Sequence, residues 1–160
     1  MRVGVLSDTH LAMGDPRFPE LVEQCRRHFA GAALILHAGD IVDPQLLSFF
    51  PQPILAVRGN LDPMELPMQR IIPLAGKRIG LIHGWGAKYD LEARVLRAFS
   101  GEKVDCIVYG HSHQPACHVV NDILLFNPGS PTDRRNAPFH SLGILTIDQE
   151  IQGEIIALDE

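Results

Sequence analysis

The sequence contains few cysteines, and their positions suggest no covalent or metal-bound framework. The three cysteines in 160 residues, Cys25, Cys106 and Cys117, are odd in number, far apart and without C-x-x-C spacing. A disulfide scaffold and a zinc knuckle are therefore excluded. We expect a protein of the reducing cytoplasm, in which Cys25 and Cys106 are small buried hydrophobic side chains.

Long apolar runs and an excess of positive charge are also missing. No stretch approaches the length of a membrane span, and the apolar run 1–7 is too short for the core of a signal peptide. The formal net charge is -5, with 14 Lys and Arg against 19 Asp and Glu. A protein that grips long nucleic acid needs clustered basic residues. We therefore expect neither a membrane nor a long nucleic acid as a partner.

The hydrophobic fraction of 46% and the charged fraction of 21% are ordinary for a globular protein. A chain of 160 residues is long enough to bury one core and too short for two ordinary domains. We expect a single domain over residues 1–160.

Apolar runs alternate with amphipathic segments through the first two-thirds of the chain, which indicates strands joined by crossover helices. The expected helices are Phe18–Phe29 and Tyr89–Phe99, each with one apolar face, and a short helix that Asp43 caps. The expected strands are Val3–Ser7, Ala33–His37, Ile54–Val57, Arg78–Ile82 and Val104–Tyr109.

The last third has β-like runs separated by turn residues, which predicts antiparallel hairpins. We place turns at Asn121-Asp122 and at Gln152-Gly153. Together the two parts predict an α/β sandwich, in which two mixed sheets pack face to face with helices outside, a four-layer α/β/β/α arrangement. The expected strands here are Ala116–Val120, Ile123–Phe126, Leu142–Asp148 and Glu154–Leu158.

Metal-ligand residue types follow the end of almost every strand expected in the first part. Ligands in α/β sheets bind outside the carboxyl ends of the strands, so these side chains can converge from distant positions. Turn chemistry explains Asp and Asn at such places, and it accounts for each residue taken alone, but it does not select this many histidines. The set consists of Asp8, His10, Asp40, Asn60, His83, His111 and His113.

Carboxylate, amide and imidazole donors without thiolate suit Mn, Fe, Zn, Co or Ni rather than Ca or a structural zinc. Seven donors are more than one ion needs, and two divalent ions about 3.5 to 4 Å apart would account for the number. We expect two divalent ions per chain, with Mn as the first choice.

The five motifs and their order resemble those of the calcineurin-like metallophosphoesterases over nearly the whole chain. The compact length and the segment Asn127-Pro128-Gly129-Ser130 are similar to the small single-domain YfcE-like phosphodiesterases. The motifs are Asp8-Thr9-His10, Gly39-Asp40-Ile41-Val42-Asp43, Gly59-Asn60-Leu61-Asp62, His83-Gly84 and Gly110-His111-Ser112-His113.

The resemblance implies a role for each ligand position. It places Asp8, His10 and His113 on one ion. It places Asn60, His83 and His111 on the other ion, with Asp40 bridging the two. Asp43 and Asp62 are better interpreted as residues that cap helices or support ligands. For His37, a histidine satisfied inside its strand and a catalytic residue both stay open.

The resemblance also implies a reaction. A hydroxide bridging two ions would attack the phosphorus of a small-molecule phosphoester, with Asp40 positioning it and Asn60 and His83 completing the catalytic site. Many relatives have His after the motif Asn, but this chain has Leu61, which cannot protonate a leaving group. The YfcE-like group shares that departure. The backbone of the segment that contains Asn127, Gly129 and Ser130 is a candidate phosphate contact, because Gly-containing turns point N–H groups at anions.

The motifs are also compatible with other functions. The same dinuclear site suits a phosphomonoesterase or a nucleotide phosphatase, and a retromer subunit resembles this family while acting as a protein-binding scaffold with an impaired metal site. No ligand position is lost here, which favours an enzyme. The resemblance is also compatible with a homo-oligomer.

Overall fold

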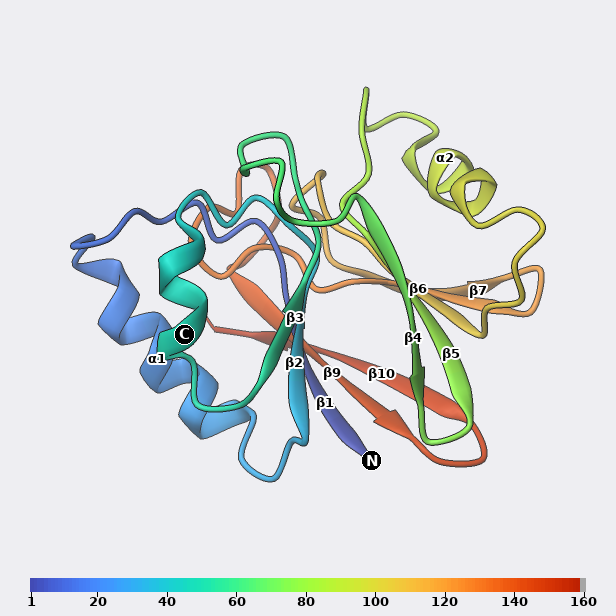
Figure 1. Cartoon of the computed structure of the whole chain (residues 1–160), viewed down its shortest axis with the longest axis horizontal. Coiled ribbons are helices and arrows are strands. Elements are labelled where there is room, and N and C mark those ends of the chain that lie inside the picture. Colours follow the sequence, from blue (N-terminus) through green and yellow to red (C-terminus); the bar gives the residue numbers. More distant parts are fainter. Residues whose placement is uncertain (159–160) are drawn as a thin grey trace.

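Two five-stranded mixed sheets face each other in the computed structural model, which describes residues 1–158 (Figure 1). The first sheet has the order β10-β9-β1-β2-β3 and the second has the order β4-β5-β6-β8-β7. The first consists of β1 (Arg2–Leu6), β2 (Leu34–His37), β3 (Ile54–Ala56), β9 (Ser141–Ile147) and β10 (Ile151–Ala157). The second consists of β4 (Gln69–Leu74), β5 (Lys77–Ile82), β6 (Cys106–Val108), β7 (Ala116–Val120) and β8 (Ile123–Asn127).

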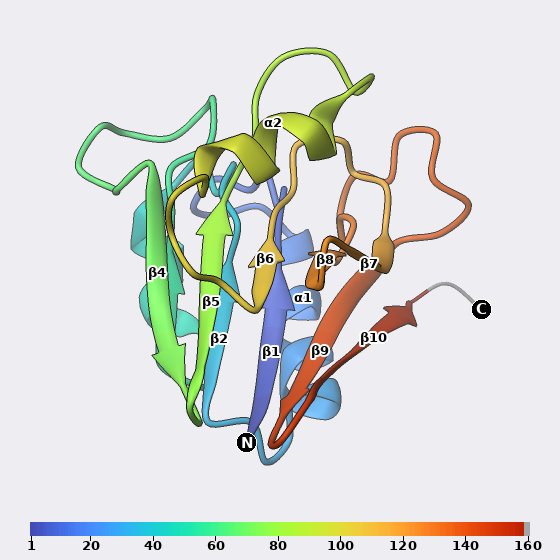
Figure 2. The same cartoon turned by 90° about the vertical axis from the view of Figure 1, so that its right-hand side faces the viewer.

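Each sheet contains three neighbouring strands that pair in parallel, and its other strand pairs are antiparallel. In the first sheet β1 and β2 pair in parallel, as do β2 and β3. In the second sheet β6 lies parallel to both β5 and β8. Figure 2 shows that the carboxyl ends of β1, β5 and β6 lie at the same end of the sandwich.

Apolar side chains fill the space between the sheets and under each helix. Val3 and Val5 of β1 pack with Leu81 and Val108 of the second sheet in one buried cluster. Helix α1 (Arg17–His28) and the 3-10 helix η1 (Pro44–Phe49) cover the outer face of the first sheet. Helix α2 (Leu91–Ala98) covers the second. The predicted four-layer α/β/β/α sandwich is confirmed.

Each α-helix ends in a phenylalanine that lies directly on its sheet. A Cβ atom on Gly4 of β1 would come within 2.6 Å of the Phe29 ring, and one on Gly80 of β5 would come within 2.9 Å of the Phe99 ring. These distances are shorter than van der Waals contact. Glycine at the two strand positions therefore permits the close approach of helix and sheet.

The expected helices and strands are present, with ends shifted by at most three residues, and three features differ. Strand β4 was not expected. The turn expected at Gln152-Gly153 is wrong, because Gly153 pairs with Leu145 inside β10 and the chain bends earlier, at residues 148–150. The short helix that Asp43 caps is a 3-10 helix.

The hairpin turn at Asn121-Asp122 is confirmed, since both residues have positive φ and join β7 to β8. Among residues 1–158, none of the helices is long and apolar enough for a membrane span. The domain expected over residues 1–160 includes residues 159 and 160, which lie outside the described part.

Candidate metal centre

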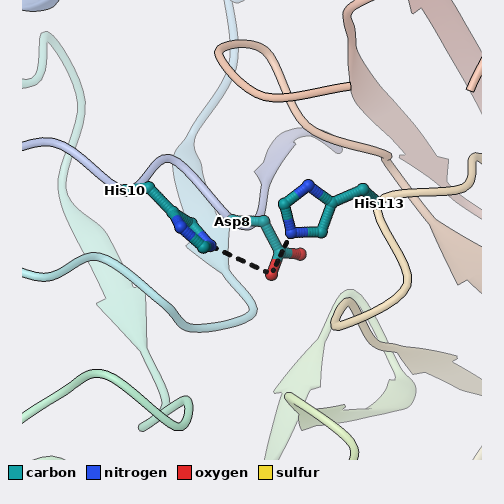
Figure 3. A group of neighbouring side chains, drawn as sticks. All are labelled: Asp8, His10 and His113. Atoms are coloured by element: carbon teal, nitrogen blue, oxygen red, sulfur yellow. Dashed lines mark ion pairs between the residues drawn. The ribbon is translucent and has the colours of Figure 1, made fainter. Parts of the chain in front are cut away.

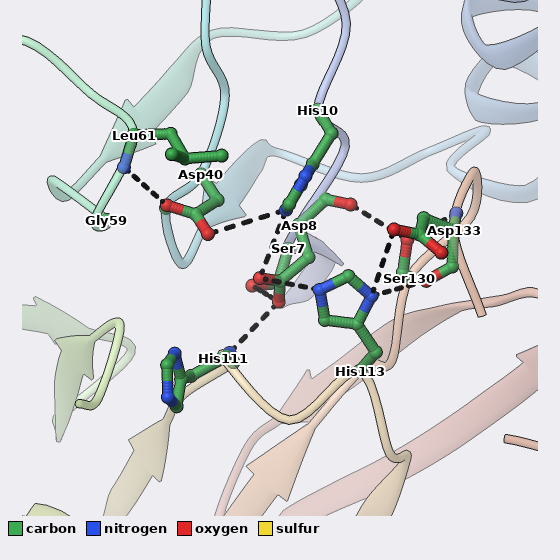
Figure 4. A network of polar contacts seen from close by, with 12 residues as sticks. Ser7, Asp8, His10, Asp40, Gly59, Leu61, His111, His113, Ser130 and Asp133 are labelled. Carbon is green, nitrogen blue, oxygen red and sulfur yellow. Dashed lines mark hydrogen bonds and ion pairs between the residues drawn. The ribbon is translucent and has the colours of Figure 1, made fainter. Parts of the chain in front are cut away.

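Loops that follow strands of both sheets bring the predicted ligands to one place. Asp8 and His10 follow β1, Asp40 follows β2, and His83 follows β5. His113 follows β6 in the loop to β7. Figure 4 shows Asp8, Asp40 and His113, from the loops that follow β1, β2 and β6, gathered at one place.

Asp8, His10 and His113 form the first close group (Figure 3). The Oδ1 atom of Asp8 lies 3.4 Å from Nε2 of His113 and 3.8 Å from Nε2 of His10. Asp8 and His113 are fully buried, and His10 is mostly so. Three donor atoms therefore point at a common centre.

Asp8, Asp40 and His83 form a second group that shares Asp8 with the first. The Nε2 atom of His83 lies 3.3 Å from Oδ2 of Asp40 and 3.8 Å from Oδ1 of Asp8. That same Oδ2 atom of Asp40 lies 3.4 Å from Nε2 of His10. Both carboxylates thus lie between histidines contributed by different loops.

The unpaired atoms of these groups fit divalent metal ions. Among residues 1–158, Oδ1 of Asp8 and Nε2 of His10, His83 and His113 are buried without a hydrogen-bond partner. An unsatisfied buried polar atom costs about 1 to 3 kcal/mol. Ligands at about 2.1 Å from one ion lie roughly 3.0 to 3.4 Å apart. The shortest distances between histidine nitrogens and carboxylate oxygens in these groups are close to that range. Nitrogen and carboxylate donors without thiolate suit Mn, Fe, Zn, Co or Ni.

Backbone carbonyls orient two of the histidine rings. Nδ1–H of His83 donates to the carbonyl oxygen of Ala38 over 2.8 Å, and Nδ1–H of His113 donates to that of Asp133. A carbonyl only accepts, so the proton of each neutral ring is on Nδ1. The Nε2 lone pairs of both rings are therefore free on the side of the carboxylates, where a metal ion would bind.

The clustered charges shift the pKa values of the metal-free protein. The facing carboxylates of Asp40 and Asp8 raise the pKa of His10 to about 9. Burial works to lower the pKa of His83, but Asp40 and Asp8 raise it overall. Burial likewise opposes ionisation of Asp8 and Asp40, yet the neighbouring histidines hold both pKa values well below the ordinary range. At neutral pH a proton on His10 thus provides positive charge beside the two carboxylates.

Five of the seven predicted ligands adopt left-handed backbone conformations. Such conformations cost about 1 to 3 kcal/mol for a residue other than glycine, and they cluster at functional sites. The loops therefore hold these side chains against a local energetic preference. The φ angles are 56° for Asp8, 51° for His10, 58° for Asp40, 73° for His111 and 62° for His113.

Asp62 holds the loop that carries Asp40. Its Oδ2 atom accepts hydrogen bonds from the backbone N–H groups of Asp40 and Gly59, over 2.7 and 2.8 Å. Its Oδ1 atom accepts from Ile41 and Val42, both over 2.8 Å. One carboxylate therefore satisfies four backbone donors, consistent with the supporting role expected for it. Asp43 caps η1 through Gln45 N–H, also as expected.

The glycines before three ligand positions are required for two different reasons. Gly39 has a φ of 101° and needs the freedom of glycine. A Cβ atom on Gly59 would overlap Oδ1 of Asp40, and one on Gly110 would overlap Oγ of Ser7. Glycine is required at these two positions because there is no room for a side chain.

Two predicted ligands lie on the loops of the site but outside the close groups. The His111 ring centroid lies 5.3 Å from that of His83, and the backbone N–H of His111 donates to Oδ2 of Asp8 over 3.0 Å. The Nε2 atom of His111 lies 2.6 Å from the carbonyl oxygen of Gly86. Asn60 is exposed at the surface.

The three predicted phosphate contacts are engaged within the protein. Nδ2 of Asn127 donates to the Gly110 carbonyl over 3.2 Å, and its Oδ1 accepts from Gly129 N–H over 2.9 Å. Oγ of Ser130 donates to the Asp8 carbonyl over 2.8 Å. These bonds support the ligand loops, and a contact with phosphate stays a prediction.

Sequence patterns do not point to Ser7 or Thr132, and His37 was not among the predicted ligands. Ser7 Oγ donates to Oδ2 of Asp8 over 2.6 Å, and Thr132 Oγ1 donates to the Thr9 carbonyl over 2.5 Å. No pattern distinguishes such hydroxyl groups from ordinary loop residues. His37 is fully buried, bonded to Thr9 and Gly39, and burial lowers its pKa to about 4.

Residues 1–150 match the sequence profile of the calcineurin-like phosphoesterase superfamily domain. A probable metallophosphoesterase of Methanocaldococcus jannaschii is 35% identical and aligns with 100% of this chain and 83% of its own. Phosphodiesterase YfcE of Escherichia coli is 31% identical over 59% of this chain and 53% of its own.

Solved structures agree in fold. That of YfcE superposes with a TM-score of 0.71 at 22% identity, covering 99% of this chain and 100% of the other. That of wild-type Vps29 of Entamoeba histolytica in complex with Zn²⁺ superposes with a TM-score of 0.70 at 22% identity, with the same coverage. These two likenesses extend to the whole sandwich.

Proposed function

The chain belongs to the calcineurin-like phosphoesterase superfamily, and we propose that it hydrolyses small phosphodiesters with two divalent metal ions. The observation that carries the proposal is the set of buried, unpaired donor atoms of Asp8, His10, His83 and His113. Such atoms are costly to bury and face one another at distances that suit shared ions.

Each ion would have its own set of ligands. Asp8, His10 and His113 would hold one, and Asn60, His83 and His111 the other, with Asp40 shared between them. When bound, the two ions would supply an acidified water to attack phosphorus and positive charge for the phosphoryl oxygens. Mn is the first candidate and Fe, Zn, Ni and Co are the others.

The protein's own groups keep Asp40 available for both ions. Its Oδ1 atom accepts a hydrogen bond from the backbone N–H of Leu61 over 3.0 Å, which leaves Oδ2 directed at His10 and His83. Asp62 fixes the backbone on either side of this contact. Asp40 is therefore held in one orientation between the two groups of ligands.

Leu61 favours substrates whose leaving group needs no proton. Its side chain is 56% exposed and follows Asn60, so it borders the site, and it has no acidic hydrogen. An aryl oxide departs without protonation more readily than an alkoxide does. We expect activated diesters to be cleaved faster than alkyl esters.

Two other functions share this framework. A phosphomonoesterase or nucleotide phosphatase would use the same ligands, and a binding scaffold is the second alternative, because Vps29 has the same fold. The retained donor set, Asp8 and Asp40 included, favours hydrolysis.

Comparing the rates at which the protein hydrolyses bis-p-nitrophenyl phosphate, a diester, and p-nitrophenyl phosphate, a monoester, distinguishes these functions. The protein is stripped of metal and resupplied with Mn, and Asp40→Asn is the control. We expect Mn-dependent cleavage that is faster for the diester and at least roughly 100-fold slower in Asp40→Asn, by analogy with lost metal-site contacts. Faster monoester cleavage would indicate a phosphatase, and bound metal without cleavage of either ester would indicate a scaffold.

A further inference from the structure

Side-chain donors hold the exposed loop between β5 and α2 in place. Arg94, in the second turn of α2, donates from Nε to the carbonyl of Trp85 over 2.7 Å and from Nη1 to that of Tyr89 over 3.0 Å. Its Nη2 donates to the carbonyl of Ala87. One guanidinium group therefore binds three carbonyls of a five-residue segment.

The carbonyl in the middle of this segment contacts a predicted ligand. Gly86 lies between two of the residues that Arg94 binds, and its carbonyl oxygen lies 2.6 Å from Nε2 of His111. Gly86 has a φ of 82°, and a Cβ atom there would come within 3.3 Å of the Arg94 guanidinium carbon. The direction of the Gly86 carbonyl thus depends on where Arg94 holds the chain.

The start of α2 provides no comparable support. Asp90 precedes the helix in a left-handed conformation, with a φ of 57°, and its side chain makes no capping hydrogen bond. Residues 85–90 are all exposed. Because packing and capping contribute so little here, the hydrogen bonds of Arg94 and His111 determine the shape of the loop.

We propose that Arg94 is a positioning residue for the second metal ion. By fixing the Gly86 carbonyl, it keeps the proton of His111 on Nε2 and leaves Nδ1 as the donor atom for the ion shared with His83. The inference rests on the proposed function, because it requires His111 to be a metal ligand. Lysine cannot replace Arg94, since one ammonium group does not match the planar fork that reaches three carbonyls.

The test compares Arg94→Lys and Arg94→Gln with the wild type and with Arg97→Gln. Arg97 is an exposed arginine on the same helix, which makes it a matched control. Long-range ¹H–¹⁵N NMR of the metal-free proteins at pH 8 reports the tautomer of each histidine ring. Titration with Mn then gives the affinity of the weaker site.

We expect His111 to be protonated on Nε2 in the wild type and in Arg97→Gln, and to exchange between tautomers in both Arg94 variants. Mn affinity at the weaker site should fall about 10- to 100-fold in those variants, as for other residues that orient ligands. His113 should keep its tautomer, which shows that the fold is intact.

An unchanged His111 tautomer, or unchanged Mn affinity, in a folded Arg94 variant would overturn the inference. A wild-type chain that binds no Mn would instead refute the proposed function. The His111 tautomer would still decide whether Arg94 positions this ring, so the two failures are distinguishable.

Discussion

The Nε2 atom of His83 lies 3.3 Å from Oδ2 of Asp40, although the two residues follow strands of different sheets. His83 follows β5 and Asp40 follows β2, so an ion bound by both would tie the two sheets together. Metal binding and folding stability should consequently be coupled.

Adding Mn to the metal-free protein should raise its melting temperature. A ligand that binds only the folded state at 100 times its Kd stabilises by about 2.7 kcal/mol. For a chain of this size that corresponds to roughly 5 to 11 °C. Calorimetry with and without a chelator measures the shift, and His83→Ala should reduce it. An identical melting temperature in both conditions would argue against binding between the sheets.

Asp62→Ala should destabilise the protein and weaken its metal site. The substitution removes the acceptor for four backbone N–H groups around Asp40. We expect a loss of roughly 2 to 4 kcal/mol in urea unfolding and about 10- to 100-fold weaker Mn binding.

Asp43→Ala is the matched control for Asp62→Ala. Asp43 lies in the loop that carries Asp40 but caps η1, so its removal should cost about 1 kcal/mol and leave Mn affinity unchanged. Equal losses of metal affinity in the two variants would show that any change in this loop disturbs the site.

Gly59→Ala should abolish tight metal binding. The new methyl group would overlap Oδ1 of Asp40 and displace that carboxylate. Gly31→Ala, where a Cβ atom meets nothing within 4 Å but φ is 80°, isolates the effect of backbone strain. It should cost about 1 to 2 kcal/mol and leave Mn content per chain unchanged. Normal Mn content in Gly59→Ala would contradict the close packing of Gly59 on Asp40.

His37 should make the metal-free protein less stable as the pH falls from 6.5 to 4. Burial lowers its folded pKa to about 4 from 6.5, so the unfolded chain binds the extra proton in this range. The contribution of neutral His37 to the free energy of unfolding is fully present above pH 6.5. It declines as the pH falls to 4, by on the order of 3 kcal/mol in total. Urea unfolding of wild type and His37→Gln between pH 4 and 7.5 measures it. If the variant keeps the wild-type pH slope, other groups are responsible.

Five of the seven candidate ligands lie close together in the structure, and the sequence identifies them because their chemistry is concentrated at strand ends. Asp8, His10 and His113 are close together, as expected of residues on one ion. Their left-handed backbone is not predictable, because Asp and His ordinarily occupy such conformations only when surrounding contacts enforce them. Around Asp8 such contacts include the hydrogen bonds of Ser130 and Thr132 to the carbonyls of Asp8 and Thr9, and both residues are distant in sequence.

Two errors in the predicted elements have physical causes. Strand β4 contains Pro73 and lies at the edge of its sheet, where proline is tolerated although it weakens a strand pattern. Gly153 resembled a turn residue, but its function is to make room for the Phe126 ring, which a Cβ atom would approach to 2.6 Å. The position of a strand in its sheet decided the first case, and packing between elements decided the second.

Counting the manganese bound per chain, and recording the EPR spectrum of the loaded protein, tests directly whether Asp8, Asp40 and the histidines hold a pair of ions. We predict two ions per chain with the spectrum of an exchange-coupled Mn pair, and loss of that coupling in Asp40→Asn. One ion per chain, or two ions without coupling in the wild type, would contradict a dinuclear centre bridged by Asp40.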